Sequence, residues 1–217
     1  MQIYFIPGLG FDHRIYDKLD LGDVTPTYLD WIEPQRKESI AHYAARLSEA
    51  IDPNATNNVL IGHSMGGMMS REIAAQKNID RIFLISSIRS RAELPMQFRI
   101  MKPLRMHHLM AKQPLIRTIG WWGKGQDYKT REEQELFKSM VGGHSNSYLR
   151  WALKELARWQ EPELPDTTQV FQIHGTKDKT FPYKRIKNAD LPIEGGGHFM
   201  VYKHPDVISA FIKERLI

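Results

Sequence analysis

The chain has 217 residues, of which 41% are hydrophobic and 25% charged, and this composition excludes a disordered or fibrous protein. It contains no cysteine, which excludes a disulfide scaffold, a zinc ribbon and a cysteine nucleophile. No run approaches the roughly 18 apolar residues of a membrane span, and a strand pattern begins at once, without a secretory signal. We therefore expect a cytoplasmic protein without integral membrane association.

Up to residue 88, short apolar runs alternate with segments whose apolar residues recur at helical spacing. The predicted strands are residues 3–6, 24–29, 59–61 and 81–86, and the predicted helices are residues 12–19, 40–51 and 65–76. Pro26 interrupts the second strand, which favours an edge position, while Asp12 and Ser39 are expected to cap the first two helices. Apolar strands that alternate with helices predict a parallel sheet covered on both faces.

At about Arg89 the alternation stops, and no strand pattern appears before residue 161. Helical spacing predicts helices over residues 96–110, 131–140 and 147–159 instead. Strands are predicted again at residues 169–175 and 189–193, followed by a helix at residues 205–215. We therefore expect a core formed by residues 1–88 and 162–217, interrupted by a helical insertion at residues 89–161.

The net charge of +5 is concentrated in the first part of this insertion. Residues 89–131 hold ten basic residues and two acidic ones, Glu93 and Asp127, a local charge of about +8. Such a segment attracts an anionic substrate, a nucleic acid or a membrane surface, or it is the solvated face of packed helices. Because it holds no recognition motif for nucleic acids, we expect no nucleic-acid partner.

The stretch Gly62-His63-Ser64-Met65-Gly66 lies between an apolar strand and a helix, where Gly-x-Ser-x-Gly forms a nucleophile elbow. In this tight turn the serine backbone is strained, and side chains two residues before and after it would collide, so both positions favour glycine. The helix that follows points its free N–H groups at the reacting centre. A glycine-rich turn without function is the alternative interpretation of so short a pattern.

A serine hydroxyl is a weak nucleophile near neutral pH, so it needs a base and a group that orients the base. His198 is the strongest candidate base, because it follows the last predicted strand in a glycine-rich loop. Asp178, in the loop after the preceding strand, is the strongest candidate for the orienting acid. His63 is expected to point away from Ser64 and His174 to lie beneath the acid loop. No histidine spacing predicts a metal site.

With these residues the sequence resembles the α/β-hydrolase superfamily, in the branch with a serine nucleophile and a helical cap. The resemblance rests on the elbow at Ser64, the His-Gly-x-x-Asp-x-x-x-Pro stretch with Asp178 and the Gly-Gly-His stretch with His198, in the chain order of that family. It covers nearly the whole chain and implies a mostly parallel α/β-hydrolase sheet, in a minimal version without the leading hairpin. Residues 89–161 lie where the family places its cap.

The resemblance also implies roles for the matching residues. Ser64 would be the nucleophile, His198 the general base and acid, and Asp178 the acid that holds the imidazole. The loop Pro7-Gly8-Leu9-Gly10 is similar to the family's His-Gly-x oxyanion loop, with proline where histidine is commoner. By that match the backbone N–H groups of Leu9 and Met65 would form the oxyanion hole.

From the resemblance we expect a carboxylesterase-like or thioesterase-like hydrolase that forms an acyl-enzyme on Ser64 with a small apolar or anionic acyl substrate. Serine at the elbow argues against haloalkane dehalogenase and epoxide hydrolase chemistry, because the resemblance implies a carboxylate nucleophile for those reactions in this superfamily. No cofactor is implied, because the triad and the oxyanion hole suffice. Two alternatives stay open: a receptor of the same fold that binds a ligand without turnover, and a hydrolase of carbon–carbon bonds.

Overall fold

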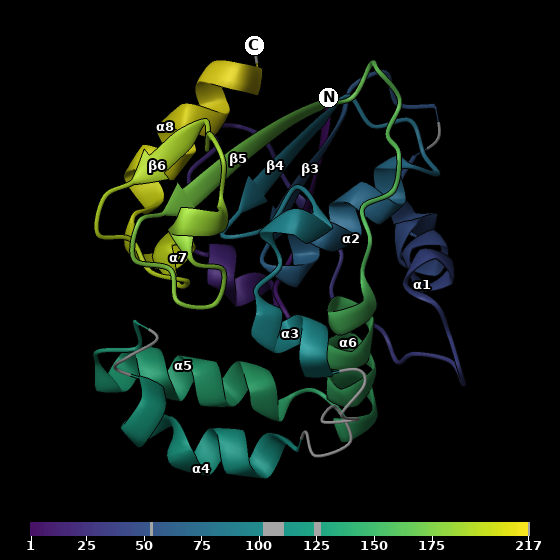
Figure 1. Cartoon of the computed structure of the whole chain (residues 1–217). Coiled ribbons are helices and arrows are strands. Elements are labelled where there is room, and N and C mark those ends of the chain that lie inside the picture. The colour runs from purple at the N-terminus through teal and green to yellow at the C-terminus, as the bar shows by residue number, and fades with distance from the viewer. Residues whose placement is uncertain (53, 102–110, 124–126, 217) are drawn as a thin grey trace.

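Six strands form one sheet at the centre of the structure, a computed structural model that describes residues 1–52, 54–101, 111–123 and 127–216 (Figure 1). The strands are β1 (Gln2–Ile6), β2 (Thr27–Tyr28), β3 (Asn58–His63), β4 (Arg81–Ile85), β5 (Gln169–Gly175) and β6 (Leu191–Ile193). Their order is β2-β1-β3-β4-β5-β6, and all neighbouring pairs are parallel. Among the described residues, this confirms the predicted α/β-hydrolase sheet without a leading hairpin.

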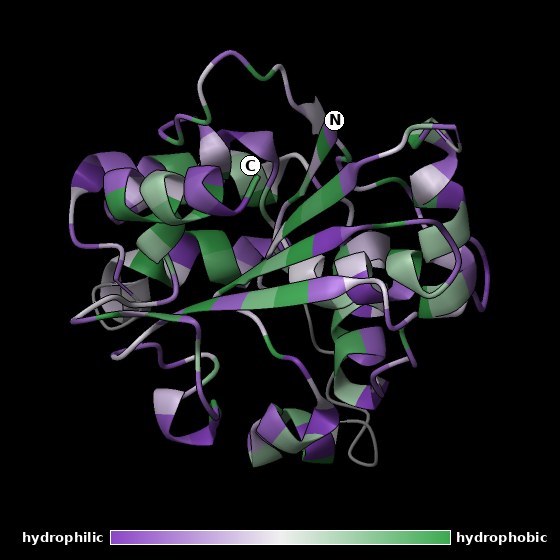
Figure 2. Cartoon of the chain, turned by 90° about the horizontal axis from the view of Figure 1, so that it is seen from above, coloured by the Kyte–Doolittle hydropathy of each residue, from purple (hydrophilic) through white to green (hydrophobic). Residues whose placement is uncertain are grey.

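The middle strands are apolar on both faces because helices cover both faces of the sheet. In β3 every residue is buried, and in β4 only Arg81 is partly exposed. Figure 2 shows hydrophobic residues along the central strands and polar residues on the outer sides of the surrounding helices. On one side of the sheet lie α1 (Ile40–Leu47) and α2 (Met65–Ala74), and on the other lies α8 (Pro205–Leu216) (Figure 1).

Between β4 and β5 the chain forms helices at one end of the sheet (Figure 1). They are α3 (Met96–Met101), α4 (Lys112–Trp122), α5 (Arg131–Gly142) and α6 (Asn146–Arg158). Helix α5 begins with a capping box in which Thr130 and Glu133 satisfy each other's backbone N–H groups. The buried side chains of α5 and α6 belong to the same hydrophobic cluster as the strands, so these helices share the core of the sheet.

Most predicted elements are confirmed, and the differences have local causes. Ser39 caps α1 as predicted, but its last turn, Ser48–Ala50, is a 3₁₀ helix, and only His13–Tyr16 of the segment after Asp12 is helical. The sequence pattern missed α4, because Pro114 and Gly120 are poor helix formers and interrupt the helical pattern in the sequence. Pro114 lies in its first turn, where a backbone N–H has no partner within the helix and proline is tolerated. Of the helix predicted over residues 96–110, residues 102–110 lie outside the described residues.

The carboxyl ends of the parallel strands meet at one edge of the sheet. Ile6 pairs with Gly62, His63 with Ile85 and Ile85 with Ile173. The loops that follow β1, β3, β5 and β6 therefore converge, although they come from distant parts of the sequence. In parallel α/β sheets this is the edge at which ligands bind.

Candidate active site

Ser64 lies in a sharp turn between β3 and α2, with φ 53° and ψ −120°. This is a strained conformation for a residue other than glycine, and such strain persists where the surrounding structure enforces it. A Cβ at Gly62 would lie 2.5 Å from backbone atoms of Gly66, and a Cβ at Gly66 would lie 2.0 Å from the carbonyl oxygen of Ile6. Glycine at both positions is therefore a steric requirement of the turn and of its contact with β1.

Hydrogen bonds from the neighbouring strand fix the serine backbone. The N–H of Ser64 donates to the carbonyl oxygen of Ile85 at 2.9 Å, and the hydroxyl of Ser87 donates to the carbonyl oxygen of Ser64 at 2.6 Å. Gln172 supports this contact from β5, because its amide donates to the carbonyl oxygen of Ser87 at 3.0 Å. Ser87 and Gln172 were not predicted as parts of the site, since no local motif marks a contact made across strands.

The structure brings Ser64, His198 and Asp178 together in one chain of hydrogen bonds. The Nε2 atom of His198 lies 2.9 Å from the Oγ atom of Ser64, and its Nδ1 atom lies 2.8 Å from the Oδ2 atom of Asp178. The serine follows β3, the aspartate follows β5 and the histidine follows β6. All three side chains are buried, so little water competes for these hydrogen bonds.

Asp178 is held as a carboxylate. Its Oδ1 atom accepts hydrogen bonds from the backbone N–H groups of Thr180, at 2.8 Å, and Phe181, at 2.9 Å. Burial by itself would raise the pKa of Asp178, but His198, the adjacent His174 and the N–H of Phe181 outweigh it and hold the pKa below its usual value. A charged carboxylate at Nδ1 orients the imidazole and favours its protonated form.

His63 and His174 are buried next to this chain but do not contact Ser64. The Nε2 atom of His63 lies 2.9 Å from the carbonyl oxygen of His198, so this ring holds the main chain of the candidate base. Burial, together with the adjacent His198, lowers the pKa of His63 to about 3. The Nε2 atom of His174 lies 2.8 Å from the carbonyl oxygen of Phe181, in the loop that follows Asp178.

The loop after β1 passes directly over the elbow. The N–H of Phe11 donates to the carbonyl oxygen of Gly8 at 3.0 Å and closes a turn in which Gly10 has φ +80°. That conformation favours glycine. Leu9 lies in this turn and lines the same cavity as Ser64, and Met65 is the first residue of α2.

A cavity of about 690 Å³ opens beside Ser64 and His198. Its wall is mostly apolar and includes Phe98 from α3, Leu115 from α4, Phe137 from α5 and Leu153 from α6. Lys179 is the only lysine, arginine or carboxylate among the lining residues that the structure describes. The size suits a small molecule, and the lining suits an apolar group near the serine.

Within the described parts of the chain, no group of three or more histidine, aspartate and glutamate side chains could hold a metal ion. None of the described helices is long and apolar enough to cross a membrane.

The sequence matches the model of a family described as the Alpha/beta hydrolase family over residues 3–211, and no curated protein matches it. Its fold is similar to an esterase from Exiguobacterium antarcticum, with a TM-score of 0.68, 14% identity and coverage of 100% of this chain and 92% of that chain. It is also similar to the RedJ-thioesterase from the prodiginine biosynthetic pathway in Streptomyces coelicolor, with a TM-score of 0.63 and 17% identity. That comparison covers 98% of this chain and 84% of the thioesterase chain. A third similar structure is an epoxide hydrolase from Bacillus megaterium, with a TM-score of 0.68, 13% identity and coverage of 97% of this chain and 91% of that chain. Identities this low show the shared fold alone.

Proposed function

The chain belongs to the alpha/beta hydrolase family, and we propose that it is a serine hydrolase that cleaves an ester or a closely related acyl bond. The observation that carries this proposal is the chain of hydrogen bonds from Ser64 through His198 to Asp178. A buried hydroxyl with an imidazole at 2.9 Å and a carboxylate behind that imidazole is the arrangement that activates serine for nucleophilic attack.

In the proposed mechanism, the Oγ atom of Ser64 attacks the carbonyl carbon of the substrate while Nε2 of His198 accepts the hydroxyl proton. Asp178 stabilises the imidazolium that forms. The backbone N–H groups of Leu9 and Met65 donate to the oxyanion of the tetrahedral intermediate. Protonated His198 gives its proton to the leaving group, and the bond between the carbonyl carbon and the leaving group breaks to yield an acyl-enzyme.

The second half of the reaction repeats these steps with water. His198 removes a proton from a water molecule, which attacks the acyl carbon and forms a second tetrahedral intermediate. Its collapse releases the carboxylic acid and returns the proton to Ser64. Serine at the elbow favours this route over the epoxide hydrolase chemistry that some proteins of similar fold carry out.

For the substrate, we infer an acyl group that is apolar next to the carbonyl carbon. The apolar wall of the 690 Å³ cavity supports this, since it surrounds the serine with leucine and phenylalanine side chains. Lys179 lies at the same cavity and would favour a substrate that carries a negative charge beyond the apolar part. In this proposal residues 89–161 act as a cap, because α3 to α6 supply most of that wall.

The test is hydrolysis of p-nitrophenyl esters with acyl chains from two to twelve carbons, with Ser64→Ala and His198→Ala as controls. We expect turnover with an optimum in chain length, and loss of turnover in both variants. A fluorophosphonate probe should label wild-type protein and leave Ser64→Ala unlabelled. Labelling without ester turnover would favour a different bond, such as a carbon–carbon bond. Neither turnover nor labelling would refute the enzyme proposal and favour a ligand receptor.

A further inference from the structure

The turn that follows β1, residues 8–11, is held from outside the sheet at both of its ends. The carbonyl oxygen of Gly8 accepts a hydrogen bond from the N–H of Phe11 at 3.0 Å, which closes the turn, and a second one from the indole N–H of Trp31 at 2.9 Å. The carbonyl oxygen of Phe11 lies 3.1 Å from the Nε2 atom of His144. Because a carbonyl oxygen only accepts, Nε2 carries the proton of this hydrogen bond. Two side chains from distant positions thus hold both ends of the turn.

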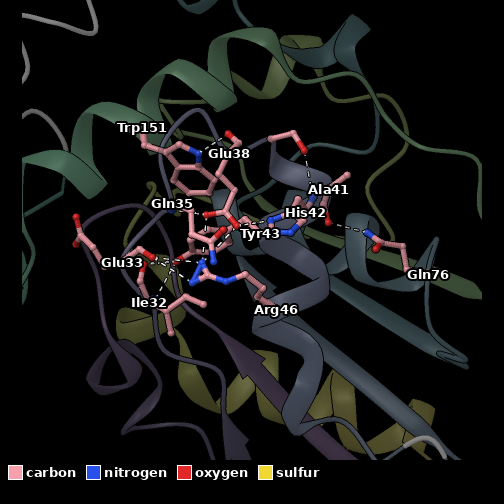
Figure 3. A network of polar contacts seen from close by, with 11 residues as sticks. Ile32, Glu33, Gln35, Glu38, Ala41, His42, Tyr43, Arg46, Gln76 and Trp151 are labelled. Carbon is pink, nitrogen blue, oxygen red and sulfur yellow. Dashed lines mark hydrogen bonds and ion pairs between the residues drawn. The ribbon is translucent and has the colours of Figure 1, made fainter.

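The residue after Trp31 is fixed to α1. The hydroxyl of Tyr43 donates to the carbonyl oxygen of Ile32 at 2.6 Å and accepts a hydrogen bond from the N–H of Ile32 at 2.8 Å (Figure 3). Tyr43 is fully buried, and the guanidinium group of Arg46 donates to the carbonyl oxygen of Glu33 at 3.2 Å. Since both backbone groups of Ile32 are bound to one buried side chain, Trp31 has a fixed position relative to the core.

His144 lies in the turn between α5 and α6, and this turn is anchored as well. The ammonium group of Lys112 donates to the carbonyl oxygens of Gly142 and His144, both at 3.0 Å. The hydroxyl of Ser145 donates to the carboxylate of Glu33 at 2.7 Å and so joins the turn to the segment after β2. The ring of His144 therefore reaches the carbonyl oxygen of the first turn from a fixed part of the proposed cap.

The two side chains that bind the turn share one neighbour. The ring centroid of Tyr148, a buried residue of α6, lies 5.5 Å from that of Trp31 and 4.9 Å from that of His144. On the turn itself, a Cβ at Gly10 would lie 3.3 Å from the Cγ2 atom of Val141 in α5. The turn is therefore enclosed by two helices of the proposed cap and does not move as an independent surface loop.

An oxyanion hole stabilises the transition state only if its donors are in place before the reaction. Loss of one donor lowers kcat by about 10²-fold to 10³-fold, and a displacement of about 1 Å can cost about 10²-fold. The proposed donor Met65 is fixed by its place at the start of α2. The proposed donor Leu9 lies in the turn, outside any strand or helix, so the direction of its N–H depends on the contacts of the turn.

We propose that Trp31 and His144 are positioning residues of the oxyanion hole. Through the two carbonyl oxygens that they bind, they hold the turn in the conformation that aims the N–H of Leu9 at the oxyanion. The inference rests on the proposed function, because an oxyanion forms only if Ser64 attacks a carbonyl carbon. It gives the proposed cap a part in transition-state stabilisation, in addition to its part in lining the substrate cavity.

The test combines steady-state kinetics with inhibition by a transition-state analogue. The substrate is the p-nitrophenyl ester that wild type hydrolyses fastest, and the inhibitor is a trifluoromethyl ketone with the same acyl chain. When Ser64 adds to this ketone, a bond forms between Oγ and the carbonyl carbon, the π electron pair moves to the carbonyl oxygen, and the hydroxyl proton moves to Nε2 of His198. The resulting oxyanion occupies the oxyanion hole.

Trp31→Phe and His144→Leu should each lower kcat by about tenfold or more and leave KM within about twofold of wild type. The inhibition constant of the ketone should rise by a factor similar to the loss in kcat, since both report the stabilisation of the oxyanion. Complete labelling with a fluorophosphonate counts the folded active sites, so unfolded protein does not enter the comparison.

Two control variants separate positioning from a general effect on the fold. His144→Gln keeps a side-chain N–H that can donate to the carbonyl oxygen of Phe11 and should retain kcat within about threefold of wild type. Trp151→Phe removes an indole N–H that donates to the carbonyl oxygen of Glu38 at 3.0 Å, outside the turn (Figure 3). It should leave kcat and the inhibition constant within about twofold of wild type, at a melting temperature similar to that of Trp31→Phe.

Three results would overturn the inference. They are an unchanged kcat in both Trp31→Phe and His144→Leu, a higher KM at unchanged kcat, and a lower kcat at an unchanged inhibition constant. If wild type is labelled but hydrolyses no ester, the rate constant of labelling replaces kcat, because the phosphoryl oxygen gains charge in the same oxyanion hole. The proposed function fails in a different way, since wild type then shows neither turnover nor labelling, and the inference is refuted with it.

Discussion

Because the imidazole of His63 is buried, we expect the protein to lose stability on mild acidification. Substitution of His63 should remove this loss. The side chain has no solvent exposure, and its Nε2 atom lies 2.9 Å from the carbonyl oxygen of His198. Because a carbonyl oxygen only accepts, Nε2 carries the proton and Nδ1 carries none. The Nδ1 atom has no hydrogen-bond partner in the described structure and lies against Gly8, where an added Cβ would be 2.7 Å away. A second proton there would be a buried, unpaired charge.

The size of the effect follows from the two pKa values. Burial and the adjacent His198 lower the pKa of His63 from 6.5 to about 3 in the folded protein. Between those values the unfolded chain binds a proton that the folded chain does not, so the free energy of unfolding falls as the pH falls. From pH 7 to pH 5 this loss amounts to about 2 kcal/mol.

The perturbation is His63→Gln, whose side-chain amide can still donate to the carbonyl oxygen of His198 but does not titrate. Urea denaturation of wild type and variant at pH 7, 6 and 5 measures both free energies of unfolding. The variant should lose about 2 kcal/mol less than wild type over this range. A difference between the two proteins that is the same at pH 5 and pH 7 would refute the reasoning.

A second histidine, His13, provides a control, because its contribution to the free energy of unfolding depends on pH in the opposite direction. Its hydrogen bond to Asp30 raises the pKa of His13, although partial burial acts against it. The stabilisation by charged His13 is therefore present below pH 6.5 and disappears as the pH rises through the higher folded pKa. In His13→Gln the variant should become less stable relative to wild type as the pH falls, the reverse of the trend for His63→Gln.

Three further predictions concern the site itself. Gly66→Ala would place a Cβ 2.0 Å from the carbonyl oxygen of Ile6. The free energy of unfolding of this variant, measured by urea denaturation, should therefore be lower than that of wild type by more than about 4 kcal/mol. A smaller loss would mean that β1 and α2 can move apart. Asp178→Asn should lower kcat for a p-nitrophenyl ester by about 10³-fold or more at pH 7, because an amide cannot hold the imidazole and stabilise its charge, and kcat within tenfold of wild type would contradict the proposed role. In Lys179→Gln, KM for a p-nitrophenyl monoester of a dicarboxylic acid should rise about fivefold relative to KM for a neutral ester, whereas Lys177→Gln, outside the cavity, should not change that ratio.

The parts of the fold that could be predicted are those fixed by local rules. The apolar runs of β3 and β4 are strands because both of their faces are covered, and this leaves a direct trace in the sequence. The nucleophile elbow could also be predicted, because the contacts of Gly62 and Gly66 lie within one turn and against one neighbouring strand. Once strand ends are known, parallel topology brings the loops with Asp178 and His198 to the same edge as Ser64.

The support behind the elbow could not be predicted, because it depends on pairs of residues from separate strands. Ser87 contacts the carbonyl oxygen of Ser64, and Gln172 joins Ser87 to the carboxylate of Glu93 at 3.2 Å. Burial raises the pKa of Glu93 despite its hydrogen bonds, as expected for an acid enclosed in the core. No spacing in the sequence distinguishes these three residues from other polar residues within or near the strands.

The distribution of charge along the sequence differs from the distribution of charge in the folded protein more than any other feature does. Counting along the sequence singles out residues 89–131, with a local charge of about +8. The hollow lined by Arg36, Lys37, Arg150 and Lys154 contains none of them. These residues come from two segments that a hydrogen bond between Trp151 and Glu38 joins across 113 positions of the chain. A charge run in sequence places cations on neighbouring turns of a helix, where they diverge into solvent. Cations that converge on one point come most readily from elements that fold together from distant positions.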